Sequence, residues 1–156
     1  RKKVEPWASS IPQRFETLRL LAERGVPCGV SVSPIIPGLN DSDIAPVLAR
    51  AREAGATVAF MTLFHMAEEG MAVFDERMRQ AFPDRVAKID SALVQVRRGR
   101  RTSNTPGDRM RDRGERWEIV RQVFHAQCKR LGFNEHPRFE WGETTFRRPS
   151  RQGTLF

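Results

Sequence analysis

The first residues with chemical potential lie in the stretch PIIPGLND, residues 34–41. Gly38 has no Cβ, so a ligand can approach its backbone closely. Asn40 and Asp41 belong to the residue types that cap helices, and the N–H groups at the start of a helix favour bound anions. The spacing therefore predicts a ligand-binding elbow between a strand and a helix. The alternative is a turn followed by a helix cap, with no ligand.

Histidine and cysteine give fewer candidates. Of the three histidines, His65 follows directly on a predicted strand, where the residues of a parallel sheet meet a ligand, and it is our candidate for acid–base chemistry. The two cysteines, Cys28 and Cys128, lie far apart in the sequence. This pattern excludes a disulfide framework and a zinc site, and it fits a reducing cytoplasm. We therefore predict no metal ligand in this chain.

A third candidate region is the Arg-rich segment, residues 97–116, which holds eight arginines and three acidic residues. Arginine binds phosphate through charge-assisted hydrogen bonds and releases counterions from nucleic acids. The net charge of +8 also favours polyanionic partners. The alternative is a solvated linker whose arginines pair with acidic neighbours. The candidate phosphate or nucleic-acid contacts are Arg100, Arg101, Arg109 and Arg111.

Two βα units position these residues. The expected order is helix, strand, helix, strand over residues 11–22, 28–36, 41–54 and 57–64. Apolar residues run almost continuously at the end of the first strand, which predicts burial on both faces, as in a parallel sheet. Two strands alone do not make a stable parallel sheet. We therefore expect further strands before residue 1, so that this chain is one half of a larger α/β domain.

The remainder of the chain is predicted to be helical. We divide the sequence into βα units at 1–67, a helical extension at 68–133 that contains the Arg-rich segment, and an irregular tail at 134–156. The composition, 39% hydrophobic and 29% charged, is that of an ordinary globular protein. The sequence has no run of about 18 apolar residues, so it predicts no membrane span.

These residues resemble the second half of radical SAM proteins related to spore photoproduct lyase, often called the DNA-repair-photolyase-like group. The resemblance covers essentially all 156 residues, and PIIPGLND together with DRMRDRG is its most specific part. The matching segments are EPWASSIPQRFETLRLLAERGVPCGVSVSPIIPGLNDSDI, FPDRVAKI, RRGRRTSNTPGDRMRDRG, FHAQCKRLG and the terminal QGTLF.

The resemblance implies the C-terminal part of a partial (β/α)6 TIM-like barrel, followed by a helical C-terminal extension. It also implies two cofactors, S-adenosylmethionine and a 4Fe-4S cluster, which together generate a radical that acts on a substrate; a nucleic acid is one candidate. In this family a Cys-x-x-x-Cys-x-x-Cys loop early in the barrel holds the cluster. That spacing is absent from this sequence, and the cluster needs thiolate ligands. We therefore expect the cluster ligands in a missing N-terminal half, which becomes a required partner.

The resemblance also assigns the elbow to cofactor binding. PIIPGLND is similar in part to the Gly-x-Ile-x-Gly-x-x-Glu-like pattern that lies against the adenine of S-adenosylmethionine. Ile36 then offers an apolar face to the purine, Gly38 takes the second glycine position and Asp41 takes the acid position, whereas Pro34 replaces the first glycine. The implied cofactor-binding residues are Ile36, Gly38, Asn40 and Asp41.

Two other interpretations stay open. In the first, the chain is a basic nucleic-acid-binding module that acts through residues 97–116 without a cofactor. In the second, it is a gene fragment without function. His65 stands where the group usually carries an arginine, which marks a divergent member. An upstream in-frame segment with the cluster cysteines would favour the radical SAM interpretation over both alternatives.

Overall fold

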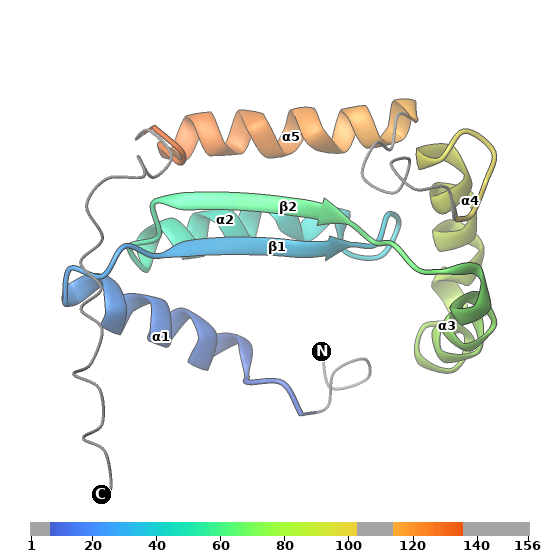
Figure 1. The fold of residues 1–156 in the computed structure, drawn as a ribbon, viewed down its shortest axis with the longest axis horizontal. Helices are drawn as coiled ribbons and strands as arrows, with labels where there is room; N and C mark the ends of the chain where they lie inside the picture. Colours follow the sequence, from blue (N-terminus) through green and yellow to red (C-terminus); the bar gives the residue numbers. More distant parts are fainter. Residues whose placement is uncertain (1–6, 103–113, 136–156) are drawn as a thin grey trace, which may run out of the picture.

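The computed structural model describes residues 7–102 and 114–135 of the chain. The predicted order of helix, strand, helix, strand is confirmed, and it is followed by three more helices (Figure 1). The helices and strands are α1 Ile11–Glu23, β1 Gly29–Ile35, α2 Ile44–Glu53, β2 Val58–Leu63, α3 Glu68–Ala81, α4 Val86–Val96 and α5 Glu115–Leu131. Two single-turn 3-10 helices, Asp41–Asp43 and Pro83–Arg85, immediately precede α2 and α4.

The strands β1 and β2 form a parallel pair, as the βα pattern predicts. Gly29 lies opposite Val58 and Val32 lies opposite Met61, after which the register shifts. At the shift the Thr62 N–H donates to the Ser33 hydroxyl oxygen at 2.9 Å. The β1–α2–β2 connection therefore gives one complete crossover unit, with a local irregularity near the carboxyl end of β1.

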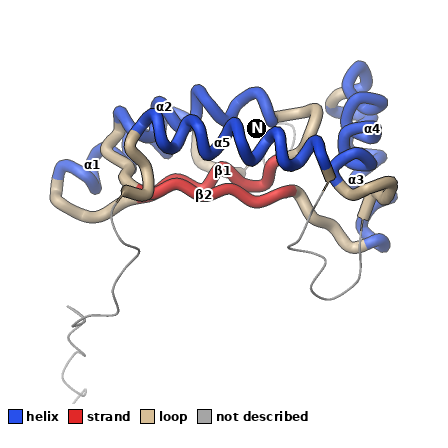
Figure 2. The backbone as a smooth tube through the Cα atoms, turned by 90° about the horizontal axis from the view of Figure 1, so that it is seen from above, coloured by secondary structure: helices blue, strands red, loops and turns tan. Residues whose placement is uncertain are grey.

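The helices α1, α2 and α5 lie on one side of the strand pair, α3 and α4 lie past its carboxyl ends, and no described helix covers the other side (Figure 2). We call the uncovered side the open face. Phe60 is 55% exposed on this face and Val58 is 50% exposed. The prediction that the first strand is buried on both faces is wrong within the described residues, because its helices all pack on one side. The open face consists of Gly29, Ser31, Ser33, Val58, Phe60 and Thr62.

Two clusters of buried side chains stabilise the fold. The larger cluster joins the covered face of the strands to α2 and α5, through residues such as Val32, Leu48 and Phe124. The second cluster lies at the carboxyl ends of the strands, where the rings of Phe64 and Phe74 stack with centroids 4.6 Å apart. Its buried members are Ile36, Phe64, Met71, Phe74, Met78, Ile89 and Leu93. The loops that follow both strands are thus anchored against α3 and α4.

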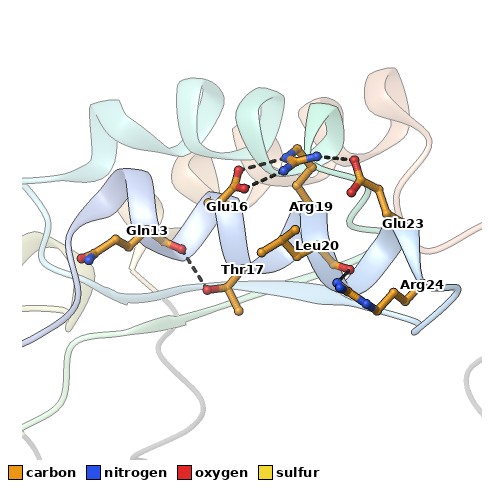
Figure 3. A network of polar contacts seen from close by, with 7 residues as sticks. All are labelled: Gln13, Glu16, Thr17, Arg19, Leu20, Glu23 and Arg24. Atoms are coloured by element: carbon orange, nitrogen blue, oxygen red, sulfur yellow. Dashed lines mark hydrogen bonds and ion pairs between the residues drawn. The ribbon is translucent and has the colours of Figure 1, made fainter.

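Helix α1 begins with a side-chain cap at Ser10. The Ser10 hydroxyl oxygen accepts a hydrogen bond from the Gln13 N–H at 3.3 Å, and the Gln13 side chain accepts from the Ser10 N–H at 2.9 Å. This reciprocal pair is a capping box. Farther along the helix Arg19 lies between Glu16 and Glu23 (Figure 3). Local signals in the sequence therefore define α1 well.

Helix α5 is amphipathic. Trp117, Val120, Phe124 and Cys128 form its buried stripe, as their spacing predicts. The helix ends at Gly132, which adopts a left-handed conformation with φ of 68°. Across residues 7–102 and 114–135, no helix combines the length and the apolar character that crossing a membrane requires.

Candidate functional site

The candidate site lies at the end of the sheet where the carboxyl ends of β1 and β2 are side by side. The Phe64 N–H donates to the Ile35 carbonyl oxygen at 2.7 Å. This bond brings together the starts of two loops, residues 36–43 after β1 and residues 64–67 after β2. In parallel α/β proteins, ligands bind at this end of the strands. The structure thus places the elbow and His65 at the same end of the sheet.

The elbow is closed by hydrogen bonds to Asn40. Its side-chain oxygen accepts from the Ile36 N–H at 2.7 Å, and its side-chain N–H donates to the Pro34 carbonyl oxygen at 3.0 Å. Asn40 occupies the N-cap position of the 3-10 turn, but the prediction that the Asn40 and Asp41 side chains cap the next helix is wrong. Neither the 3-10 turn nor α2 has a side-chain cap bond, because the Asn40 amide folds back onto the strand end instead.

Gly38 is required by the fold itself. Its φ is +82°, a left-handed conformation that side chains other than glycine rarely adopt. A Cβ at this position would lie 3.0 Å from the carbonyl oxygen of Lys88 in α4 and 3.2 Å from its carbonyl carbon. The sequence predicts the close approach of a ligand at this position; in the structure the backbone of α4 approaches it. The contact of Gly38 with adenine rests on the resemblance alone, since α4 fills the space that the missing Cβ leaves.

The other two elbow residues have different surroundings. Ile36 is buried in the second cluster, so its apolar face packs within the chain. Asp41 is half-buried and accepts a hydrogen bond from Arg116 at 3.1 Å, and Arg116 also donates to Gln95 at 3.3 Å. Asn40 and Asp41 are thus the predicted site residues that reach the surface, whereas Ile36 and Gly38 are buried and pack the elbow against the rest of the chain.

The loop after β2 is held by the start of the Arg-rich segment. Arg97 is only 8% exposed, and its guanidinium donates to the carbonyl oxygens of Phe64 and Arg101. The Thr102 hydroxyl donates to the Met66 carbonyl oxygen. The half-buried His65 lies between these two fixed carbonyl groups in the sequence. Arg97 and Thr102 are therefore fixed within the fold, whereas residues 98–100 are exposed, as the alternative of a solvated linker expects.

Arg101 is paired within the chain. Its guanidinium forms a two-pronged contact with Asp75, at 2.9 and 2.5 Å, and a further contact of 2.7 Å with Asp90. Hydrogen bonding to Arg101 lowers the pKa of Asp75 below its usual value. A phosphate at Arg101 has to compete with two carboxylates. Arg100 is exposed, whereas the predicted contacts Arg109 and Arg111 lie outside the described residues.

The described cysteines do not fit an iron–sulfur cluster. Cys28 is buried and its thiol donates to the Val26 carbonyl oxygen at 3.1 Å. Cys128 is buried in α5, and burial raises the pKa of its thiol, which disfavours the thiolate that a cluster binds. Within the part of the chain that the structure describes, no group of three His, Cys, Asp or Glu side chains is placed to hold a metal ion.

Gly114 was not singled out from the sequence, although it fixes how two helices meet. A Cβ on Gly114 would lie 2.1 Å from the Gln95 carbonyl oxygen and 2.6 Å from the Val96 carbonyl oxygen. The Gly114 N–H donates to the Val96 carbonyl oxygen at 3.1 Å. The glycine of DRMRDRG thus lets the start of α5 touch the end of α4. A glycine immediately before a predicted helix is the sequence signal that points to such a contact.

Comparison with known proteins gives no match to a family model, a curated protein or a solved structure. The resemblance to radical SAM proteins therefore rests on the sequence segments quoted above.

Proposed function

We propose that this chain is the C-terminal portion of a radical SAM enzyme related to spore photoproduct lyase, and that it contributes two βα units to a partial (β/α)6 barrel. The proposal is supported by the parallel strand pair, which has helices on one face only. In a βα barrel the helices form the outer layer and the other face of the strands lines the interior. The exposed Val58 and Phe60 are then interior residues.

The observation that carries the proposal is the meeting of the two loops at the carboxyl ends of the strands. The bond from the Phe64 N–H to the Ile35 carbonyl oxygen joins the elbow to the loop that contains His65. The resemblance assigns cofactor contact to the first loop and substrate contact to the second. Cofactor and substrate would therefore be bound at the same end of the sheet, as catalysis with a cofactor requires.

Within this proposal the elbow residues have separate roles. Ile36 and Gly38 pack against the chain and hold the shape of the loop, and Asn40 and Asp41 face S-adenosylmethionine. When bound, the 4Fe-4S cluster and S-adenosylmethionine supply the radical chemistry. Because the described cysteines do not fit the cluster, we assign its ligands to the N-terminal half of the barrel. We also propose a reducing cytoplasm as the compartment, since both thiols are free and buried.

The experiment is to express the chain together with the polypeptide encoded immediately upstream, purify the product without oxygen, and measure S-adenosylmethionine binding by equilibrium dialysis. We expect cluster absorbance and cofactor binding from the combined protein, and neither from the chain alone. A folded combined protein that binds no S-adenosylmethionine would overturn the proposal. So would an upstream region without cluster cysteines.

A second measurement separates the nucleic-acid alternative. The chain alone is titrated with a DNA duplex at several salt concentrations, because phosphate contacts give a steep salt dependence. We expect weak binding, since Arg101 is already paired with Asp75 and Asp90. Tight, salt-sensitive binding by the chain alone would favour the basic module that acts without a cofactor.

A further inference from the structure

One edge of the strand pair is closed by Asn134. Its side-chain N–H donates to the Ala59 carbonyl oxygen at 3.0 Å, and its side-chain oxygen accepts from the Ala59 N–H at 3.0 Å. The Asn134 backbone N–H donates to the Thr57 carbonyl oxygen at 3.0 Å. The turn after α5 thus satisfies the outer backbone groups of β2 much as a neighbouring strand would. Another strand cannot pair there without displacing Asn134.

The other edge, the outer side of β1, is open as far as residues 7–102 and 114–135 show. Among the described residues, β1 pairs with β2 and with no other strand. The Cys28 carbonyl oxygen accepts from the Thr57 N–H at 3.0 Å, so Cys28 is directed toward β2. Backbone groups alternate in direction along a strand, and Gly29 and Ser31 are therefore directed to the outer edge. An exposed edge of this kind is a template for another strand.

Helix α1 extends beyond this open edge. Figure 1 places α1 past the outer side of β1, and Figure 2 places it on the same side of the sheet as α2. Phe15 and Leu18 reach the larger cluster, but no residue of α1 is buried. Leu20 and Leu21 stay 38% and 39% exposed. A helix in a βα layer normally packs over two strands, and among the described strands only β1 lies beside α1.

The handedness of crossover connections decides where that second strand lies. About 98% of parallel crossovers are right-handed. The unit β1–α2–β2 steps across the sheet from β1 to β2, with its helix on the covered face. A strand that leads into α1 has its helix on the same face, so it must step in the same direction. That strand therefore lies on the side of β1 away from β2.

We propose that the outer edge of β1 is a docking site for a parallel β-strand that leads into α1. The strand pairs with Gly29–Val32 and packs beneath the exposed apolar residues of α1. We end the pairing at Val32 because the backbone of β1 becomes irregular after it, where the register with β2 shifts. Under the proposed function this strand belongs to the N-terminal half, but the docking site does not depend on any cofactor.

The test uses the full chain, extended at its amino terminus by a designed strand of about six alternating valine and threonine residues. Amide hydrogen exchange is followed by NMR in the extended and the unextended chain. We expect the Gly29 and Ser31 amides to exchange at least about tenfold more slowly in the extended chain. The matched control carries prolines at alternate positions of the added strand, which removes its hydrogen-bond donors.

A variant locates the contact. Ser31→Pro removes an N–H that is directed to the outer edge and not to β2, so the extended variant should lose the slow exchange at Gly29 while Val58 and Phe60 keep theirs. Unchanged exchange at Gly29 and Ser31 in a folded, extended chain would overturn the proposal. Protection that appears along β2 instead, with Asn134 displaced, would also overturn it. Neither outcome involves S-adenosylmethionine, so failure here is distinct from failure of the proposed function.

Discussion

The pair of Asp75 and Arg101 connects α3 to the segment that holds the loop after β2, and its contribution to stability can be measured. Both side chains are partly exposed, 23% and 33%, so we discount the strength of the pair for screening by solvent. We expect Asp75→Asn to lower the free energy of unfolding by about 1 kcal/mol at neutral pH. Urea unfolding measures this change. Glu118→Gln, which breaks an exposed pair with Arg121, is the matched control and should have a smaller effect.

The pH dependence of this effect follows from the lowered pKa of Asp75. The stabilisation is fully present above the pKa of an unfolded aspartate, about 3.9. It is lost as the pH falls through the lower pKa of the folded state. The stability difference between the parent chain and Asp75→Asn should therefore shrink in acid. A difference that stays constant from neutral pH to about pH 3 would contradict the assignment of the pair.

Gly38 shows what the sequence can and cannot predict about a single residue. The pattern Pro-Gly after a strand indicates a position where another group can come close to the backbone, and in the structure α4 does so. It does not indicate which group approaches, because Lys88 lies far along the chain and the contact depends on how α4 packs. The same limit applies to Asp41, whose residue type suggests a helix cap although its partner is Arg116 in α5.

Replacing this glycine separates backbone strain from contact with α4. Gly99 also has a positive φ, +93°, but no atom of the described residues lies within 4 Å of its Cβ position. Gly99→Ala should therefore cost only the left-handed conformation, about 1 kcal/mol. Gly38→Ala should cost about 1–3 kcal/mol more, because its Cβ meets the Lys88 backbone. Chemical unfolding of both variants gives the comparison. Equal losses would show that α4 does not crowd Gly38.

At the scale of elements, the sequence predicts what local interactions determine. The capping box at Ser10 and the apolar stripe of α5 are set by residues within a few positions of each other, and both are found where the pattern places them. Contacts between elements carry no such periodic signal. The bonds from Asn134 to Ala59 and from Gly114 to Val96 depend on the packing of α5, which the local pattern does not specify.

The junction between α4 and α5 gives a prediction at this scale. Gly114→Ala places a Cβ where the Gln95 and Val96 carbonyl oxygens already lie, so the start of α5 must move away from α4. Overpacking against backbone atoms is costly because, unlike a side chain, they cannot rotate away. We expect the free energy of unfolding to fall by about 3 kcal/mol. Thermal unfolding followed by circular dichroism measures it. Glu115→Ala, at the exposed neighbouring position, serves as the control and should change the midpoint little.

At the scale of the whole molecule, the strand pair has one covered face, one closed edge and, as far as the described residues show, one open edge. The open face exposes Val58 and Phe60, next to the unpaired edge of β1. Apolar surface beside an unpaired edge favours association, whereas the net charge of +8 opposes it by repulsion. Added salt screens that repulsion. The isolated chain should thus be only marginally stable and should associate more as salt is raised.

Variants at the outer edges of β1 and β2 should change association in opposite directions. Asn134→Ala removes the side-chain bonds to Ala59 and opens the edge of β2, so the variant should form larger species than the parent chain at the same concentration. Ser31→Pro removes an outward N–H from the edge of β1, so it should shift the distribution toward monomer. Sedimentation velocity at low and high salt measures both changes, with circular dichroism to confirm folding. A parent chain that stays monomeric at high salt and melts cooperatively at high temperature would contradict this account, because an unpaired edge beside exposed Phe60 would then carry no liability.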